Sequence, residues 1–161
     1  MARADFTLTT FIRAKPERVK NLMAAFEDLG KYHPMILGVT EIAADVAPSG
    51  LSRRRYQVTD RVQMGLLRTK IRYLATVTSP AVERLFCEAF QSPGVHLMIT
   101  YDFWEMGDQT RIEEHCVIEA PWLLRGIVRR QAMAAHAVTM AQIKHYLEKS
   151  PPADLGAPKK V

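Results

Sequence analysis

Three ionisable side chains stand in otherwise apolar patterns of this sequence, where they could carry acid–base chemistry. Asp60 and Glu114 each share the two-residue alternation of the apolar positions around them, and His136 lies in an apolar stripe with helical spacing. Burial raises the pKa of a carboxylic acid toward neutrality, and a histidine titrates close to neutrality already. Groups of this kind can move protons to and from a bound molecule.

Each of these residues also has a purely structural interpretation. A bend or bulge would turn Asp60 outward, or an arginine would pair with it. A bulge would likewise exchange Glu114 with His115, and the parity around Glu88 is unresolved because both faces of that segment hold apolar residues. His136 alternatively packs in the core with one satisfied hydrogen bond. The sequence leaves both interpretations open at each position.

A second group of residues suits the wall of a pocket for an amphipathic small molecule. Tyr56, Tyr73 and Tyr101 have inward parity on three strands, and tyrosine offers an apolar ring with one hydroxyl. Ile71 shares a face with Tyr73, and Met140 lies on the helical stripe. Ordinary core packing is the alternative. No catalytic residue is assigned, and the predicted ligand-binding set is Tyr56, Asp60, Ile71, Tyr73, Tyr101, Glu114, His136 and Met140.

No metal site or cofactor is expected. The five histidines are scattered, and neither a Cys-x-x-Cys nor a His-Glu-x-x-His spacing is present. A structural metal site needs clustered ligands. The two cysteines are too few for a disulfide framework.

The composition indicates one domain and excludes several classes of protein. The chain has 161 residues, 48% of them apolar, and no stretch approaches the ~20 apolar residues of a membrane span. The first residues lack the apolar run of a signal peptide, so a soluble, cytoplasmic protein is expected. The net charge of +5 is a mosaic, because residues 51–72 carry seven basic and one acidic side chains, and residues 83–119 carry two and eight. Nucleic acid is not an expected partner, since its binders concentrate one sign beside stacking aromatics.

The periodicity predicts the elements that must position these residues. Alternation predicts strands over residues 6–12, 39–43, 53–64, 67–77, 84–90, 95–103 and 111–120. Helical spacing predicts a helix from Pro16 to about Leu29, then a turn or short helix over 31–36. A long helix from Pro121 to about Lys149 is apolar nearly all round at its middle, which implies burial. The domain is therefore expected to span 1–149, with 150–161 as a disordered tail.

This order of strand, helix, short helix, six strands and long helix resembles the helix-grip fold of the START-like superfamily, which includes polyketide cyclase/dehydrase-like (SRPBCC) proteins. Many bacterial members carry a motif after the first helix, and four residues match its spacing: Asp28, Tyr32, Gly38 and Val39. The hairpin 107–111 is similar to the family's turn before the last strand. His33 stands where the motif has proline, and Met35 where an aromatic is frequent.

The resemblance implies an α+β fold in which a seven-stranded antiparallel sheet curls around the long C-terminal helix, with two short helices after strand 1. The implied strand order is 1-7-6-5-4-3-2, and sheet and helix enclose a mostly apolar cavity. This order pairs the basic third and fourth strands with the acidic fifth. It also places one strand between Cys87 and Cys116, so that roughly 9.6 Å separates their strands. Since disulfide Cα atoms lie within about 7 Å, no bridge is expected.

Three functions follow from the resemblance and the apolar inward faces. The first is binding or transport of a hydrophobic small molecule, such as a lipid or a polyketide-like aromatic, in the internal cavity. The alternative is an enzyme of the polyketide cyclase, aromatase or dehydratase type, with Asp60, Glu114 and His136 as candidates. The third is an interaction module with a filled core. The chain is expected to be a monomer or homodimer, and Arg53–Arg55 either touch anionic lipid headgroups transiently or protect a strand by charge.

Overall fold

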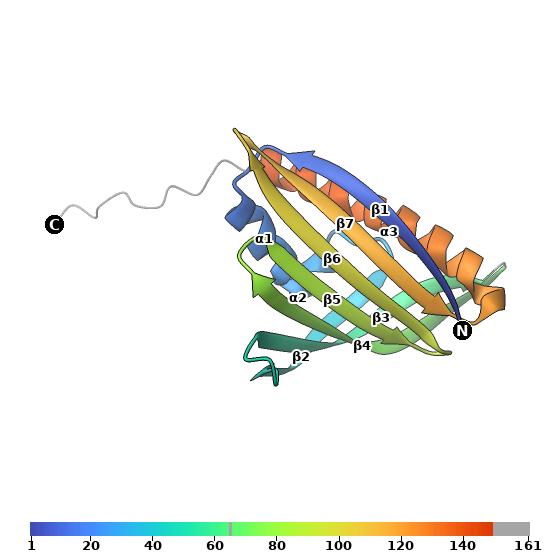
Figure 1. The fold of residues 1–161 in the computed structure, drawn as a ribbon. Helices are drawn as coiled ribbons and strands as arrows, with labels where there is room; N and C mark the ends of the chain where they lie inside the picture. The colour runs from blue at the N-terminus through green and yellow to red at the C-terminus, as the bar shows by residue number, and fades with distance from the viewer. Residues whose placement is uncertain (65, 150–161) are drawn as a thin grey trace.

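The computed structural model describes residues 1–64 and 66–149. This part of the chain forms seven strands and three helices. The expected tail, 150–161, lies outside the described residues. The elements follow in the order β1 (Ala2–Ile12), α1 (Pro16–Ala24), α2 (Phe26–Leu29), β2 (Ile36–Val46), β3 (Ser52–Met64), β4 (Leu67–Ala81), β5 (Arg84–Gln91), β6 (Val95–Met106), β7 (Gln109–Ala120) and α3 (Trp122–Lys149) (Figure 1).

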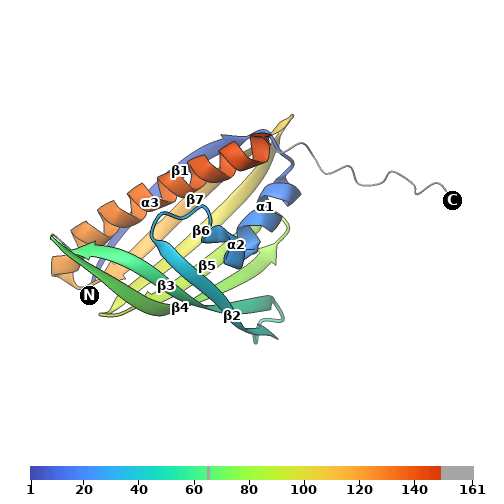
Figure 2. The same ribbon diagram turned by 180° about the vertical axis from the view of Figure 1, so that it is seen from behind.

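The seven strands form one antiparallel sheet in the order β1-β7-β6-β5-β4-β3-β2. The expected helix-grip architecture and strand order are therefore confirmed. The sheet curls, and α3 runs along its concave side, while α1 and α2 lie near the C-terminal end of α3 (Figures 1 and 2). Arg18 of α1 donates to the carbonyl oxygen of Leu147 at 3.5 Å, which ties the two helices together.

The core lies between the concave face of the sheet and α3. On β6 every second residue is buried, from Val95 to Phe103, because side chains alternate between the two faces of a strand. The stripe that α3 buries has helical spacing: Ala132, Ala135, His136, Thr139, Met140, Ile143 and Leu147. A helix that buries so broad a face gains most of its stability from packing and not from its own propensity.

Several predicted element boundaries differ from the structure. The helix from Pro16 ends at Ala24, and the short second helix covers Phe26–Leu29 instead of residues 31–36. The break at Ala25 lets Phe26 turn onto the sheet, where its ring packs against Tyr56 with centroids 5.2 Å apart. β4 continues through Ser79 and Pro80 to Ala81, and the pairing with β5 changes register there, which is how a strand tolerates proline.

The basic residues at the start of β3 form ion pairs with acidic residues of β2, which the sequence analysis did not predict. Arg53 and Arg55 of β3 pair with Asp45 of β2, at 2.9 and 2.8 Å, and Arg54 pairs with Glu41 of β2 at 2.9 Å. The basic start of β3 therefore meets acids on its outer neighbour. These ion pairs favour the interpretation of Arg53–Arg55 as a charged strand surface.

The expected pairing of β4 cations with β5 acids is wrong for the described residues. Strand β5 pairs with β4 only from Leu74 onward, so Arg68, Lys70 and Arg72 precede the shared segment. Glu88 of β5 instead contacts His96 of β6, with Oε1 and Nε2 2.7 Å apart. The β4 cations thus lie where no acidic strand flanks them.

The cysteine thiols should be free in solution and protected by the fold. Cys87 of β5 and Cys116 of β7 are buried and unbridged, with β6 between their strands. Burial raises the pKa of Cys87 to about 12 and also raises the pKa of Cys116, and the nearby Glu114 carboxylate adds to both effects. We expect no reaction of the native protein with Ellman's reagent over minutes, and two thiols per chain in concentrated guanidinium chloride without reductant. A count of zero in denaturant would reveal a bridge and contradict this strand order.

Candidate ligand-binding cavity

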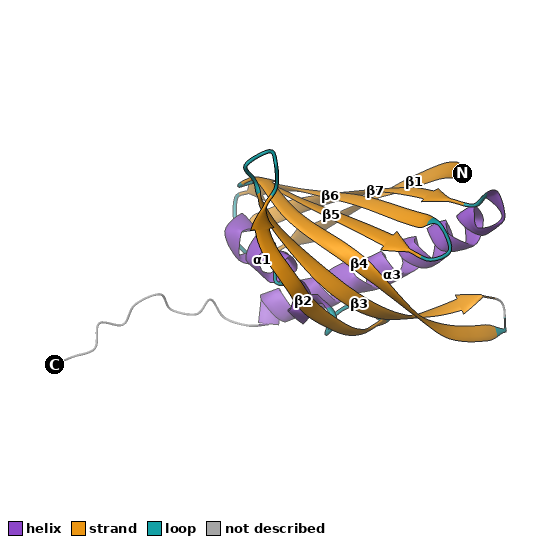
Figure 3. Ribbon diagram, turned by 90° about the horizontal axis from the view of Figure 1, so that it is seen from below, coloured by secondary structure: helices purple, strands orange, loops and turns teal. Residues whose placement is uncertain are grey.

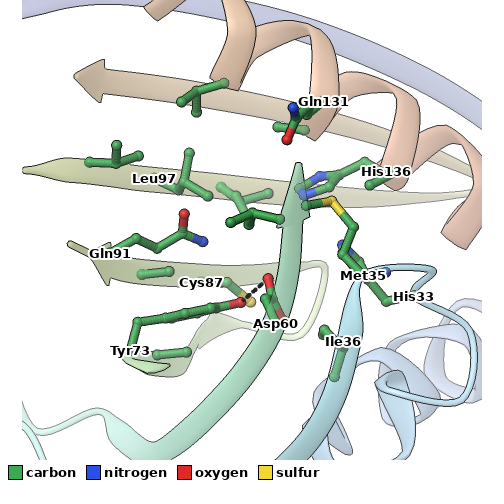
Figure 4. Close-up of a pocket in the computed structure, with 18 of the residues that line it drawn as sticks. His33, Met35, Ile36, Asp60, Tyr73, Cys87, Gln91, Leu97, Gln131 and His136 are labelled. Carbon is green, nitrogen blue, oxygen red and sulfur yellow. Dashed lines mark hydrogen bonds between the residues drawn. The ribbon is translucent and has the colours of Figure 1, made fainter. Parts of the chain in front are cut away.

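A cavity of about 190 Å³ lies between α3 and the concave face of the sheet (Figure 4). Its wall is mostly apolar, with Leu97 and Ile99 from β6 and Met140 from α3. Ala132 and Ala135 face the same space, and their small side chains keep α3 from filling it. An apolar cavity of roughly 150 Å³ can hold a benzene ring, so this one has room for a small ligand.

His136 and Glu114 form a buried pair that joins α3 to β7. The Nδ1 atom of His136 is hydrogen-bonded to Oε1 of Glu114, and the two residues are 9% and 1% exposed. Burial alone lowers the pKa of His136, but the charge and hydrogen bond of Glu114, together with the charge of Asp60, outweigh burial and raise the pKa. Nδ1–H therefore donates to the carboxylate, and the imidazole points into the cavity (Figure 4). Oε2 of Glu114 is buried without a hydrogen-bond partner.

Asp60 and Tyr73 bring a second carboxylate into the cavity from β3 and β4. The Tyr73 hydroxyl donates to Oδ2 of Asp60 at 3.0 Å (Figure 4), while the buried Oδ1 has no hydrogen-bond partner. Burial raises the pKa of Asp60 to about 6, against the opposing effects of the Tyr73 hydrogen bond and the His136 charge. Burial also raises the pKa of Tyr73, so this hydroxyl stays protonated and remains a donor. At neutral pH the site thus holds a carboxylate with one free acceptor atom.

His33 adds an uncharged imidazole from the loop between α2 and β2. Its ring lies edge-on to that of His136, with centroids 5.7 Å apart. Burial and then the charge of His136 lower the pKa of His33 to about 3, so it is neutral at physiological pH. Nδ1 of His33 accepts a hydrogen bond from the backbone N–H of Met35 at 3.3 Å, which leaves Nε2 as the N–H donor.

Seven of the eight residues predicted for the ligand-binding set line the cavity: Asp60, Ile71, Tyr73, Tyr101, Glu114, His136 and Met140. Tyr56 does not line it. It lies earlier on β3, where α2 covers the sheet, and is only 1% exposed against Phe26. Tyr56 is therefore part of the core.

The structure also shows which face of the sheet carries Glu114, His115 and Glu88. Glu114 faces inward, while His115 is exposed beside Asp5, with Nε2 and Oδ2 3.5 Å apart. On β5 Cys87 faces inward, so Glu88 lies on the opposite face of the sheet, where it pairs with His96 of β6.

Sequence reasoning missed two cavity residues in the loop before β2, His33 and Met35. A loop has no periodicity that predicts a facing direction, and the only signal was their position in the motif after the first helix. Ala132 and Ala135 of α3 also border the cavity. Met133 is half-buried against the core and does not line the cavity.

Within residues 1–64 and 66–149, no group of three His, Cys, Asp or Glu side chains could hold a metal ion. None of the helices in this part of the chain has the length and apolar character needed to cross a membrane.

The chain is similar in fold to many solved structures. A Thermus thermophilus protein shares 22% identity with a TM-score of 0.64, and the match covers 91% of this chain and 95% of the other. A START superfamily protein from Mycobacterium smegmatis matches at 16% identity and a TM-score of 0.68, over 90% and 97% of the two chains. The Zhui aromatase/cyclase from a Streptomyces species matches at 10% identity and a TM-score of 0.70, over 97% and 100%.

No protein-family model matches the sequence, and neither does any curated protein. The structural likenesses lie below 25% identity and establish the fold, which hosts many functions. They confirm the START-like resemblance at that level.

The isosteric variant Asp60→Asn should be more stable than the parent at neutral pH. Between pH about 4 and about 6 the folded state keeps the Asp60 proton while the unfolded state loses it, so the free energy of unfolding falls as pH rises. Above pH about 6 the folded protein carries the full cost of ionising the buried Asp60 carboxyl. This cost is on the order of 3 kcal/mol for a pKa raised by about two units. Asparagine cannot ionise, and its carbonyl still accepts the Tyr73 hydrogen bond.

Urea unfolding of both proteins near pH 7.5 and near pH 4 checks this expectation. The gain in free energy of unfolding of Asp60→Asn over the parent should be largest near pH 7.5 and should disappear near pH 4. Asp108→Asn, in the exposed turn before β7, controls for the loss of one charge. A destabilised Asp60→Asn at pH 7.5 would mean that the carboxylate is fully satisfied.

Proposed function

We propose that this chain, which has the helix-grip fold of START-like proteins, binds a hydrophobic small molecule in the cavity between α3 and the sheet. The observation that carries the proposal is a mostly apolar cavity whose wall includes a few ionisable side chains, among them Asp60, Glu114 and His136. Ligand pockets commonly combine an apolar wall with a small number of placed polar groups. The fold shared with a START superfamily protein and an aromatase/cyclase supports this function.

The polar groups indicate what kind of hydrophobic molecule fits. Oδ1 of Asp60 and Oε2 of Glu114 are acceptors without partners, and a buried acceptor gains from a ligand hydroxyl or N–H. The volume of about 190 Å³ lies below the ~300–1,000 Å³ of pockets that enclose drug-sized molecules. The enclosed part of the ligand is therefore one or two aromatic rings, or a short chain, with at least one hydrogen-bond donor.

Replacement of Ala135 by tryptophan should abolish ligand binding and leave the fold intact. The neutral fluorophore N-phenyl-1-naphthylamine is the probe, because it is apolar and carries one N–H donor. Ala135 borders the cavity, and an indole ring would occupy most of it. We expect at least a tenfold loss of probe affinity with a melting temperature within a few degrees of the parent.

Ala141→Trp is the matched control, since Ala141 lies on the exposed face of α3 and should leave binding unchanged. A parent that binds no probe, together with a destabilisation of about 1–3 kcal/mol in Ala135→Trp, would indicate a filled core. That result would favour the interaction module over both ligand-based functions.

A second candidate function, acid–base catalysis, is favoured by the way the cavity combines its ionisable groups. Asp60 is a carboxylate with a pKa of about 6 and a free Oδ1, which suits a general base near neutral pH. His136 is oriented by Glu114 and can donate from its other nitrogen to an oxygen that gains charge. A base and a donor in one apolar cavity are what proton removal beside a carbonyl requires, as in a cyclase- or dehydratase-type reaction.

The carbon acid 5-nitrobenzisoxazole tests the proposed base without knowledge of the substrate. A base removes the proton on its C3 atom while the ring N–O bond breaks, which yields a nitrile and a coloured phenolate. We expect turnover that rises with pH through about 6, as Asp60 ionises. Asp60→Asn should lose at least tenfold in rate, whereas Asp108→Asn should retain it. A rate no faster than buffer, in a protein that still binds the fluorophore, would leave binding as the supported function.

A further inference from the structure

A larger groove adjoins the cavity on its solvent side. It has a volume of about 660 Å³ and lies between the hairpin end of β3 and β4, the segment Pro34–Met35 and α3. Cavity and groove share five lining residues: Met35, Val62, Ile127, Gln131 and Ala135. The groove is therefore the mouth of the cavity. Figure 3 shows the β3–β4 hairpin projecting beyond the other strands at this end of the molecule.

Three arginines from three different elements line this groove. Arg61 lies on β3, Arg68 on β4 and Arg130 on α3, and all three are exposed. No side-chain ion pair joins any of them to another residue of the described chain, in contrast to Arg53 and Arg55, which share Asp45. Among the described residues that line the groove there is no Asp or Glu. The cationic groups are thus available to a bound anion.

The strand register explains why the fold itself supplies no counterion here. Arg61 lies directly opposite Lys70, and Arg68 opposite Gln63. β2 begins opposite Asp60, and β5 joins β4 only from Leu74, so neither strand extends beside the rest of the hairpin. Like charges opposite each other on a strand pair are destabilising. A bound anion would relieve that repulsion.

We propose that this groove binds the anionic group of an amphipathic ligand, a carboxylate or a phosphate monoester, whose apolar part lies in the cavity. The inference rests on the proposed binding function and adds the class of ligand. Guanidinium groups hold carboxylates and phosphates through paired hydrogen bonds, which suits them to this role. The enclosed volume of about 190 Å³ is small, so a longer ligand must continue into the groove. The apolar end thus enters first and the charged end stays at the mouth.

Displacement of N-phenyl-1-naphthylamine by three ten-carbon compounds tests the proposal. Decanoate and decyl phosphate carry the anion, and decan-1-ol has the same chain without it. We expect at least one anion to bind tenfold or more tightly than the alcohol, with an advantage that shrinks as salt is added. The stronger of the two identifies the carboxylate or the phosphate as the preferred group.

Single variants Arg61→Gln, Arg68→Gln and Arg130→Gln should each lose about three- to tenfold in affinity for that anion and leave decan-1-ol unaffected. Arg72→Gln is the matched control, since Arg72 is exposed on β4 outside the groove. Equal affinities for anion and alcohol, or an equal loss in Arg72→Gln, would overturn the anion site. If decan-1-ol still binds and Ala135→Trp still blocks it, the binding function survives that failure. Failure of all three compounds and the fluorophore to bind would overturn both proposals.

Discussion

The buried hydrogen bond between Glu114 and His136 sets how α3 sits on the sheet. A carboxylate that is 1% exposed is very costly without a partner, and here the partner comes from the middle of the long helix. The pair therefore determines which side of α3 faces β7. The same rotation places Ala132 and Ala135 over the cavity, and it turns Arg130 toward the groove.

The cavity results from a mismatch between a curled sheet and a helix with small side chains at its centre. The concave face brings Leu97, Ile99 and Tyr101 toward α3, but alanines opposite them leave the middle of the space unfilled. A loop residue, His33, closes one side with an imidazole that burial keeps neutral. The site thus presents two carboxylates, one of them paired with a raised-pKa imidazole, inside a mostly apolar wall.

Binding and catalysis draw on the same features of this site, which is why the fold alone does not separate them. An unpartnered Oδ1 on Asp60 serves a carrier as a hydrogen-bond acceptor and serves an enzyme as a base. The groove with Arg61, Arg68 and Arg130 adds an orientation, since an anion held at the mouth directs the apolar end toward these groups. Orientation of this kind is useful to either function.

The sequence by itself determined the strands, the long helix and the inward parity of Tyr73, because alternation and helical spacing are local properties of the chain. It made Asp60 and Glu114 candidates for the inner face, but only the structure showed that no bulge turns them outward. The resemblance in element order and motif added the strand order. Only the tertiary structure decided that Tyr56 is core while Tyr73 borders a cavity, since that depends on whether α2 lies over the strand. The pairing of His136 with Glu114 and the lack of acids around the β4 cations were likewise decided by long-range register and sheet curvature. No periodicity within one segment encodes the distance between two elements, and that distance sets which ionisable groups meet.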